Sequence, residues 1–193
     1  MDVTFERTSR RSYAVEVHRP GAPTVRMDPA PGYDDHFPHD LQHFVVEEQL
    51  GLTRGIFGRI DQGGSAATFH LVTSSGTNAR ATARERRRLH AREHQLRDEP
   101  SDVGASERAT YVAWYDWLGH HPDPAMRARA TDMKPVAGSI LDRLAPDERD
   151  RLLAALPRIC ARVDELTTRW SQLEVGGRMT VAWSPRRARH AVR

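Results

Sequence analysis

The sequence predicts an α+β fold, in which a small, mostly antiparallel sheet packs with four or five helices. Two observations support this class. Segments near both ends of the chain, at 12–18 and 178–183, alternate apolar and polar residues as half-buried strands do. Between them, apolar residues recur at helical spacing, most clearly over 147–174. We therefore expect the N- and C-terminal strands to share one sheet, against which the helices pack.

Length and composition indicate a single globular domain. The chain has 193 residues, of which 38% are hydrophobic and 28% charged, a balance typical of globular rather than disordered proteins. A chain of this length can bury roughly 70% of its unfolded surface. We expect one α+β domain over residues 1–183 and a basic, disordered tail over 184–193.

The sequence also predicts a cytoplasmic protein. Cys160 is the only cysteine, so no disulfide can form within the chain, which suits a reducing compartment. No run of 18 apolar residues is present, so no membrane span is expected. Residues 1–11 contain arginines but lack the apolar core of a secretory signal.

Turn-forming residues divide the N-terminal half of the chain into short elements. Glycines and prolines separate the apolar segments, and Gly51 is placed to end a helix in the left-handed conformation. The expected elements are a strand at 12–18, a turn at 20–23, a partner strand at 24–27, a loop at 28–35, a helix at 36–50, a short helical turn and loop within 52–65, and a strand at 68–73.

The C-terminal half is expected to be mainly helical. The first of its helices is highly charged and has few large apolar residues, so most of it should be solvated. The longest contains Pro157, which should kink or split it near Leu156. The expected elements are helices at 79–98, 107–118 and 147–174, a linker at 100–105 and a last strand at 178–183.

The segment 36–47 gathers the residue types that ligate metal ions. On one helix, His39, His43 and Glu47 follow at i, i+4 and i+8, within about 80° of one another around the axis. Asp40 lies on the same side, and His36 joins this stripe if the helix begins early enough. Two histidines and a carboxylate suit zinc, with iron or manganese as alternatives. The sequence therefore predicts a divalent-metal site drawn from these five residues.

The expected roles follow from the chemistry of such sites. Glu47 is either the carboxylate ligand or, if another group completes the site, the general base of a metal-dependent hydrolase. Asp40 is either a ligand or the group that orients His43. The same ion would serve equally well as a structural element, so the sequence does not decide whether the chain is an enzyme, and it names no small-molecule substrate.

A local resemblance accompanies this pattern. His39-Asp40-Leu41-Gln42-His43 resembles the HDxxH element of the coenzyme Q biosynthesis zinc-protein family, which lies on a helix and binds metal. That family adds a glutamate twelve positions after the second histidine, where this chain has Gly55. The resemblance covers five residues and implies a similar metal site on one helix, in which Glu47 replaces the missing ligand. The segments PHDLQHFVVE and VGGRMTVAW also resemble segments of uncharacterised proteins of GC-rich bacteria, which implies no activity.

A second motif, His90-x-x-Glu93-His94, matches the inverted zinc-protease pattern, in which both histidines bind zinc and the glutamate is the base. Five arginines lie around it between positions 86 and 97, and their charge would repel a cation. By contrast, residues 28–61 hold seven acidic residues and two arginines. We therefore place the metal site in the acidic segment.

The main alternative is a non-enzymatic interaction module. In that case the apolar seam over 152–173 or the arginine-rich helix at 80–97 would dock a protein partner, and the histidines would be surface groups. Binding of nucleic-acid phosphates by the same arginines is less favoured, because no helix-turn-helix, zinc finger or RNP motif accompanies them.

Overall fold

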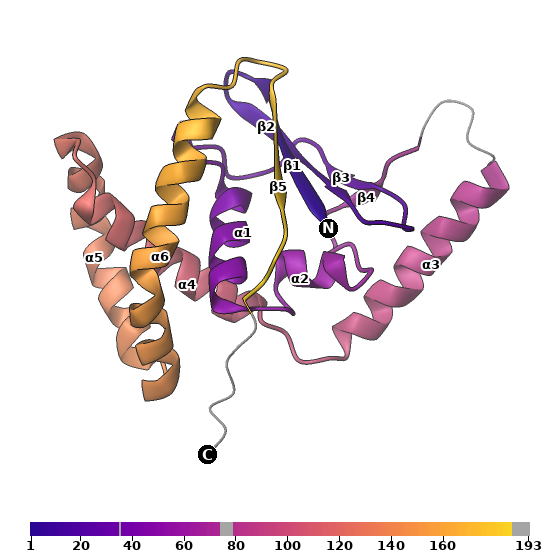
Figure 1. The fold of residues 1–193 in the computed structure, drawn as a ribbon. Helices are drawn as coiled ribbons and strands as arrows, with labels where there is room; N and C mark the ends of the chain where they lie inside the picture. Colours follow the sequence, from indigo (N-terminus) through magenta and orange to yellow (C-terminus); the bar gives the residue numbers. More distant parts are fainter. Residues whose placement is uncertain (35, 74–78, 187–193) are drawn as a thin grey trace.

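The computed structural model describes residues 1–34, 36–73 and 79–186 of the chain. Its strands form one five-stranded antiparallel sheet in the order β4-β3-β2-β1-β5 (Figure 1). The strands are β1 (Asp2–Ser9), β2 (Ser12–His18), β3 (Val25–Met27), β4 (His70–Leu71) and β5 (Arg178–Ala182). The predicted α+β class, with N- and C-terminal strands in one sheet, is therefore confirmed.

Strand β1 is an element that the sequence analysis did not predict. It lies between β2 and β5, so that Phe5 is paired with Val15 on one side and with Met179 on the other. Its only apolar residues are Val3 and Phe5, both fully buried. An alternation of two apolar residues is a weak signal, although this strand is the one that joins the two ends of the chain.

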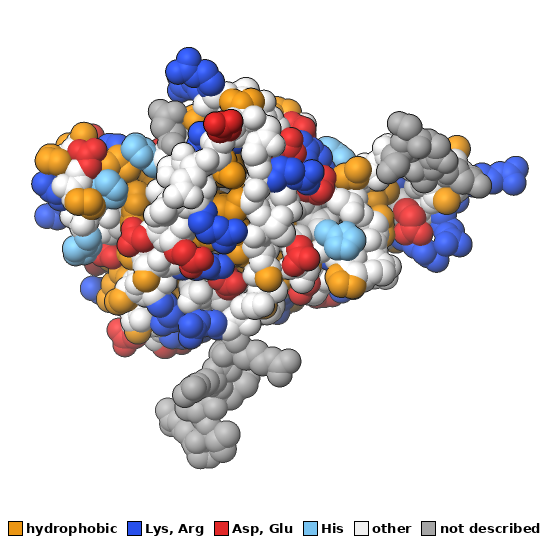
Figure 2. All heavy atoms as spheres, turned by 45° about the horizontal axis from the view of Figure 1, so that its top comes forward, with side chains coloured by type: hydrophobic (Ala, Val, Ile, Leu, Met, Phe, Trp, Pro, Cys, Tyr) orange, Lys and Arg blue, Asp and Glu red, His pale blue; other side chains and the backbone are white. Residues whose placement is uncertain are grey.

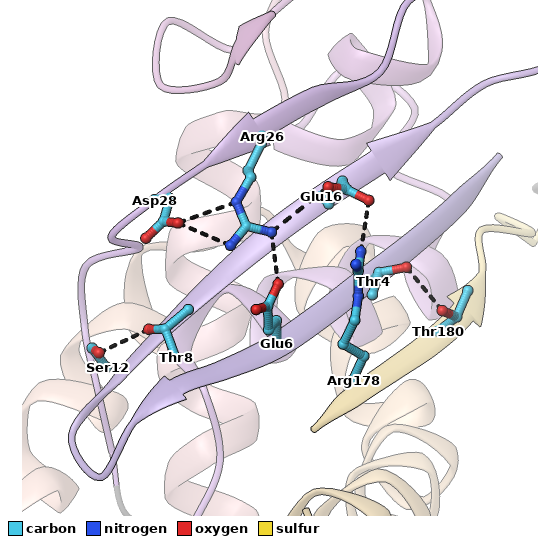
Figure 3. Close-up of polar contacts among 9 residues, drawn as sticks. All are labelled: Thr4, Glu6, Thr8, Ser12, Glu16, Arg26, Asp28, Arg178 and Thr180. Carbon is cyan, nitrogen blue, oxygen red and sulfur yellow. Dashed lines mark hydrogen bonds and ion pairs between the residues drawn. The ribbon is translucent and has the colours of Figure 1, made fainter. Parts of the chain in front are cut away.

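The sheet has one buried and one polar face. On the buried face, Phe5 lies edge-on to Phe44 of the first helix, with ring centroids 6.2 Å apart. On the other face, the guanidinium of Arg26 pairs with Glu6 at 2.8 Å and with Asp28 at 2.9 Å (Figure 3). Paired charges on a solvated face are normal for an antiparallel sheet. The candidate functional residues therefore lie on the helical side.

Within the described ranges, six helices accompany the sheet. They are α1 (His39–Leu50), α2 (Ile56–Asp61), α3 (Ala79–Arg97), α4 (Val103–His120), α5 (Pro124–Arg143) and α6 (Pro146–Ser171). Helix α1 packs against α2, α4 and α6, and ten of its twelve residues are buried. Helix α3 extends away from the rest of the molecule and buries only Glu93 and Leu96 (Figure 1). The predicted solvated character of the 79–98 helix thus agrees with the structure.

The C-terminal half differs from expectation at two places. Residues 124–143 form helix α5, for which no element was expected, because its buried residues are few and small and Pro135 lies inside it. Helix α6 is not split at Pro157, which faces solvent. The apolar seam on its opposite side, from Leu152 to Trp170, is buried in the core, and this packing outweighs the backbone hydrogen bond that proline removes.

The apolar seam of α6 is one of the two surfaces that would dock a protein partner if the chain is an interaction module. Side chains that already pack in the core of the same chain are not available to a partner. Outside the core, charged side chains of both signs are interspersed over the face shown in Figure 2. None of the helices in the described part of the chain combines the length and the apolar composition that a membrane crossing requires.

The last described residues continue from β5 along the helical side of the sheet. Trp183 is 5% exposed, and the backbone N–H of Arg186 donates to the carbonyl of Glu48 in α1. Most of the predicted disordered tail, residues 187–193, lies outside the described residues.

Candidate metal centre

Helix α1 carries both histidines, of which His43 is buried and His39 partly exposed. It begins at His39, directly after Pro38, and ends at Gly51, whose φ of 70° is the predicted left-handed cap. The expected start at position 36 is three residues too early, so the observed helix is about one turn shorter than predicted. The start at His39 leaves His36 on the preceding loop, exposed, with its backbone N–H donated to Asp34 Oδ1.

His39 and His43 lie together with a residue from another helix, Glu107 of α4. The two Nε2 atoms are 3.1 Å apart, and His43 Nε2 is 3.6 Å from Glu107 Oε2. One ligand atom from each of the three residues falls within 4.8 Å of the others. Ligand atoms bound tetrahedrally at zinc distances are roughly 3.3 Å apart. This group is therefore close enough to hold a metal ion.

His43 is held in the form that metal binding requires. Its side chain is 1% exposed, and burial, aided by the charge of His39, lowers its pKa to about 3. The imidazole is therefore neutral at neutral pH, as a metal-bound imidazole must be. Its other ring nitrogen, Nδ1, lies 2.8 Å from the hydroxyl oxygen of Ser106.

A hydrogen-bond relay continues from Ser106 to Glu47. The Ser106 hydroxyl donates to Glu47 Oε1 at 2.9 Å, so toward His43 its oxygen acts as an acceptor and Nδ1 carries the proton. The Nε2 lone pair of His43 then faces His39 and Glu107. A buried partner that fixes the tautomer of a metal-binding histidine is a common feature of metal sites.

Glu47 itself lies outside the group. It is fully buried, and its carboxylate accepts the backbone N–H groups of Ile56 at 2.8 Å and Phe57 at 2.9 Å, in the first turn of α2. Burial raises its pKa to about 7, although these hydrogen bonds oppose the shift. Glu47 thus anchors α2 to α1 and supports His43 through Ser106.

Position 55 has no room for a side chain beside Glu47. A Cβ on Gly55 would lie 2.3 Å from the carboxyl carbon of Glu47. The Glu47 carboxylate thus takes up the space beside residue 55, but it is directed to α2 and Ser106 rather than to the histidines. The third residue of the group comes from α4 instead.

Asp40 also points away from the two histidines. Its carboxylate accepts the hydroxyl of Tyr13, on strand β2, and burial raises its pKa, with the Tyr13 hydrogen bond opposing the shift. Its buried position links α1 to the sheet. Of the five residues expected in the site, the structure therefore brings together His39 and His43.

The rival motif on α3 is dispersed in the structure. Glu93 is buried and accepts the backbone N–H and the hydroxyl of Ser65, at 2.7 and 3.2 Å. His90 and His94 are both exposed. The glutamate therefore fixes α3 to the loop before β4, and the motif forms no metal group among the described residues.

Sequence reasoning missed Ser106 and Glu107. The corresponding helix was expected to begin at residue 107, whereas α4 begins at Val103 and places both residues in its first turn and a half. A local signal exists, because Glu107, Thr110 and Trp114 recur at helical spacing on one face. Nothing in that spacing says which helix faces them.

Comparison of the chain with protein-family models, with curated proteins and with solved structures gave no match.

Proposed function

We propose that this protein binds one divalent metal ion through His39 Nε2, His43 Nε2 and the Glu107 carboxylate. The observation that carries the proposal is the convergence of the three ligand atoms within 4.8 Å. The buried relay behind His43 supports it, because an exposed cluster formed by chance has no reason to be backed by a fully buried carboxylate.

Zinc is the ion that the donor set suits best. Two imidazole nitrogens and one carboxylate oxygen form a three-residue zinc site, with the fourth position left to water. Iron(II) and manganese accept the same donors and remain alternatives.

We extend the proposal to metal-dependent hydrolysis. An ion with an open position lowers the pKa of bound water to near 7 and supplies a nucleophile for attack on an ester or amide carbonyl. In this chain, His39, His43 and Glu107 would hold the ion, and Ser106 would orient the ring of His43. Glu47 would act in this scheme as a positioning residue, because Ser106 stands between it and the ligand group and its carboxylate is fully buried.

The test is metal analysis of the purified full chain. We expect about one equivalent of zinc, iron or manganese in the wild type, and none in His39→Ala/His43→Ala. Glu107→Gln should weaken zinc binding in a competition titration, since a neutral amide is a poorer ligand. His36→Ala is the matched control, because this histidine is exposed and outside the group. Equal metal content in the double variant, or no zinc uptake by the wild type, would overturn the proposal.

A second candidate function rests on α3. This helix carries seven arginines, buries only Glu93 and Leu96, and projects from the molecule (Figure 1). Arg86 and Arg87 are both exposed. If α3 binds nucleic-acid phosphates, affinity for a mixed-sequence RNA should fall steeply with salt, and Arg86→Ala/Arg87→Ala should reduce that slope. Absence of RNA binding at low salt would exclude this function.

A further inference from the structure

A pocket opens directly beside the candidate metal ligands. It has a volume of about 450 Å³, and His39 and Glu107 both contribute to its wall. Pockets of this size accommodate small organic molecules. Because two of the three candidate ligands line it, a molecule in the pocket would lie next to an ion held by the group.

Gln42 supplies an unused polar group in this wall. It lies one turn after His39 on α1, lines the pocket and is only 8% exposed. Its side-chain amide makes no hydrogen bond within the described residues, and its nitrogen and oxygen are not sealed from solvent. A ligand in the pocket can therefore replace the water that these two atoms otherwise bind. Its N–H₂ group donates and its carbonyl accepts, which matches the two complementary groups of a carboxamide.

Apolar side chains form another part of the wall. Trp114 lines the pocket but is only 9% exposed, because its ring stacks on Trp117, at 4.7 Å, and on Phe37, at 6.3 Å between centroids. The indole is therefore rigidly placed before any ligand arrives. Tyr111 and Met133 extend this surface. Rigid aromatic walls favour a ligand that carries an aromatic ring.

The charges around the pocket disfavour anions. Glu107 and Asp34 line it, and none of the described residues in its wall is an arginine or lysine. The guanidinium of Arg129 lies over the Trp114 ring, 5.9 Å from its centroid, but its charge is compensated by Asp34 at 2.6 Å. Phosphate and carboxylate groups are usually held by arginine or by several N–H donors, and the described wall offers no such arrangement.

We infer that this pocket binds a small, uncharged carboxamide that carries an aromatic group, with Gln42 hydrogen-bonded to the amide and the ring against Trp114. The inference deepens the proposed function and rests on it for the role of this ligand as a substrate. It narrows the substrate from esters and amides in general to neutral aromatic amides. Binding itself does not require the ion, which allows the two proposals to be tested apart.

The test uses benzamide and benzoate, which have the same shape but differ in charge. Each is titrated against the full chain by saturation-transfer NMR, once after metal removal with a chelator and once after loading with zinc. We expect saturable benzamide binding to both samples, and at least tenfold weaker binding of benzoate to the metal-free sample. Benzamidine, the cationic analogue, should not bind more tightly than benzamide to the zinc-loaded sample, in which the ion would offset the charge of Glu107.

Variants on α1 locate the binding. Gln42→Met keeps the size of the side chain but removes both hydrogen-bonding groups, and should weaken benzamide binding by about tenfold, the loss expected when hydrogen bonds to the ligand are removed. Gln49→Met is the control, because Gln49 lies two turns further along the same helix, is 9% exposed and does not line the pocket. Both variants are first shown to be folded by their melting temperatures.

The outcomes separate the two proposals. Zinc uptake without benzamide binding, equal affinity for benzoate in the metal-free sample, tighter binding of benzamidine to the zinc-loaded sample, or an unchanged affinity of Gln42→Met would each overturn the pocket inference and leave the metal site standing. Benzamide binding that depends on Gln42, in a protein that takes up no zinc, would support the pocket and overturn the metal proposal.

Discussion

At the scale of single residues, Glu47 and Gly55 share one tight space. A Cβ on Gly55 would meet the Glu47 carboxylate at 2.3 Å, and this carboxylate is held by α2 and Ser106. We expect Gly55→Ala to lower the free energy of unfolding by about 2–3 kcal/mol, as overpacking a core does.

Urea denaturation measures this effect against a matched glycine. Gly138 lies inside α5, and a Cβ there would meet nothing within 4 Å. Gly138→Ala should therefore stabilise the protein by about 0.5–1 kcal/mol, since glycine is unfavourable within a helix. Equal denaturation midpoints for the two variants would mean that the Glu47 carboxylate does not occupy this space.

Ser106 is the residue on which the relay behind His43 depends. Ser106→Ala removes the acceptor of the Nδ1 proton and one donor to Glu47. We expect zinc affinity to fall about 10–100-fold, as it does when such a supporting group is lost, measured by competition with a chelating dye. Thr110→Val is the control, because the Thr110 hydroxyl lies 3.4 Å from the same nitrogen, too far for a strong hydrogen bond. A larger loss in Thr110→Val would assign the relay to Thr110 instead.

The environment of Cys160 raises the pKa of its thiol and should make it slow to react. Burial, followed by the negative charge of Asp116, raises the pKa of this thiol to about 12, and its Sγ lies 3.5 Å from Asp116 Oδ2. Only the thiolate reacts, so alkylation by iodoacetamide at pH 8 should be on the order of 100-fold slower than for free cysteine.

The pH dependence of this reaction has a defined sign. The rate should still rise tenfold per pH unit at pH 9, because the thiol remains far below its pKa. Asp116→Asn removes the negative charge, lowers the pKa and should accelerate alkylation, whereas Asp132→Asn, at an exposed position on α5, should not. A rate that levels off near pH 8.5 would show an ordinary, unshifted thiol.

At the scale of elements, α1 differs most from its sequence pattern. The pattern suggests one apolar side, formed by Leu41, Phe44 and Val45, and one polar side. In the structure both sides are buried, because α4 covers the side that carries His43 and the sheet meets Asp40 through Tyr13. The polar side chains of α1 are therefore largely paired inside the protein rather than solvated.

Helix α6 allows a direct test of the cost of a proline within a helix. Pro157 is exposed and lies in the middle of an unbroken helix. Pro157→Ala should restore a backbone hydrogen bond without disturbing the core, and should raise the free energy of unfolding by about 1–3 kcal/mol. Thermal melting and urea denaturation both report this change. A destabilised variant would indicate that the seam packs only with the local backbone geometry that Pro157 imposes.

At the scale of the whole molecule, the two ends of the described chain close the core together. β1 pairs with β5, and after β5 the ring of Trp183 lies 5.3 Å from Phe44 of α1 and 5.8 Å from Phe57 of α2. Contacts between such distant parts of the chain form only when the complete fold is present.

Removing this closing side chain should therefore affect the whole protein. We expect Trp183→Ala to lower the free energy of unfolding by about 3–5 kcal/mol, a large share of the roughly 5–15 kcal/mol typical of a domain. Val175→Ala, at a position that is 57% exposed, should change it by less than about 0.5 kcal/mol. A similar small effect for both would mean that the Trp183 segment does not belong to the core.

The elements that sequence reasoning found are those with strong local periodicity or clear turn residues. The alternation at 12–18, the left-handed cap at Gly51 and the seam of the last helix all appear in the structure. The elements that it missed, β1 and α5, carry only a few buried apolar residues each. Their formation depends on neighbours that pair with them or pack on them, which a local pattern does not contain.

The residues of the candidate site can also be separated into those that the sequence predicted and those that only the packing of the chain brought together. The sequence by itself determined that His39 and His43 lie one helical turn apart, because the helical repeat places residues i and i+4 side by side. Tertiary structure alone decided the third member of the group, since Glu107 reaches the histidines only through the packing of α4 on α1. It also decided the contacts of the two acidic residues that share the helix with the histidines. Glu47 is hydrogen-bonded to α2, and Asp40 is hydrogen-bonded to the sheet. A helical repeat specifies directions around one axis, whereas the partner in each direction is chosen by the packing of the whole chain.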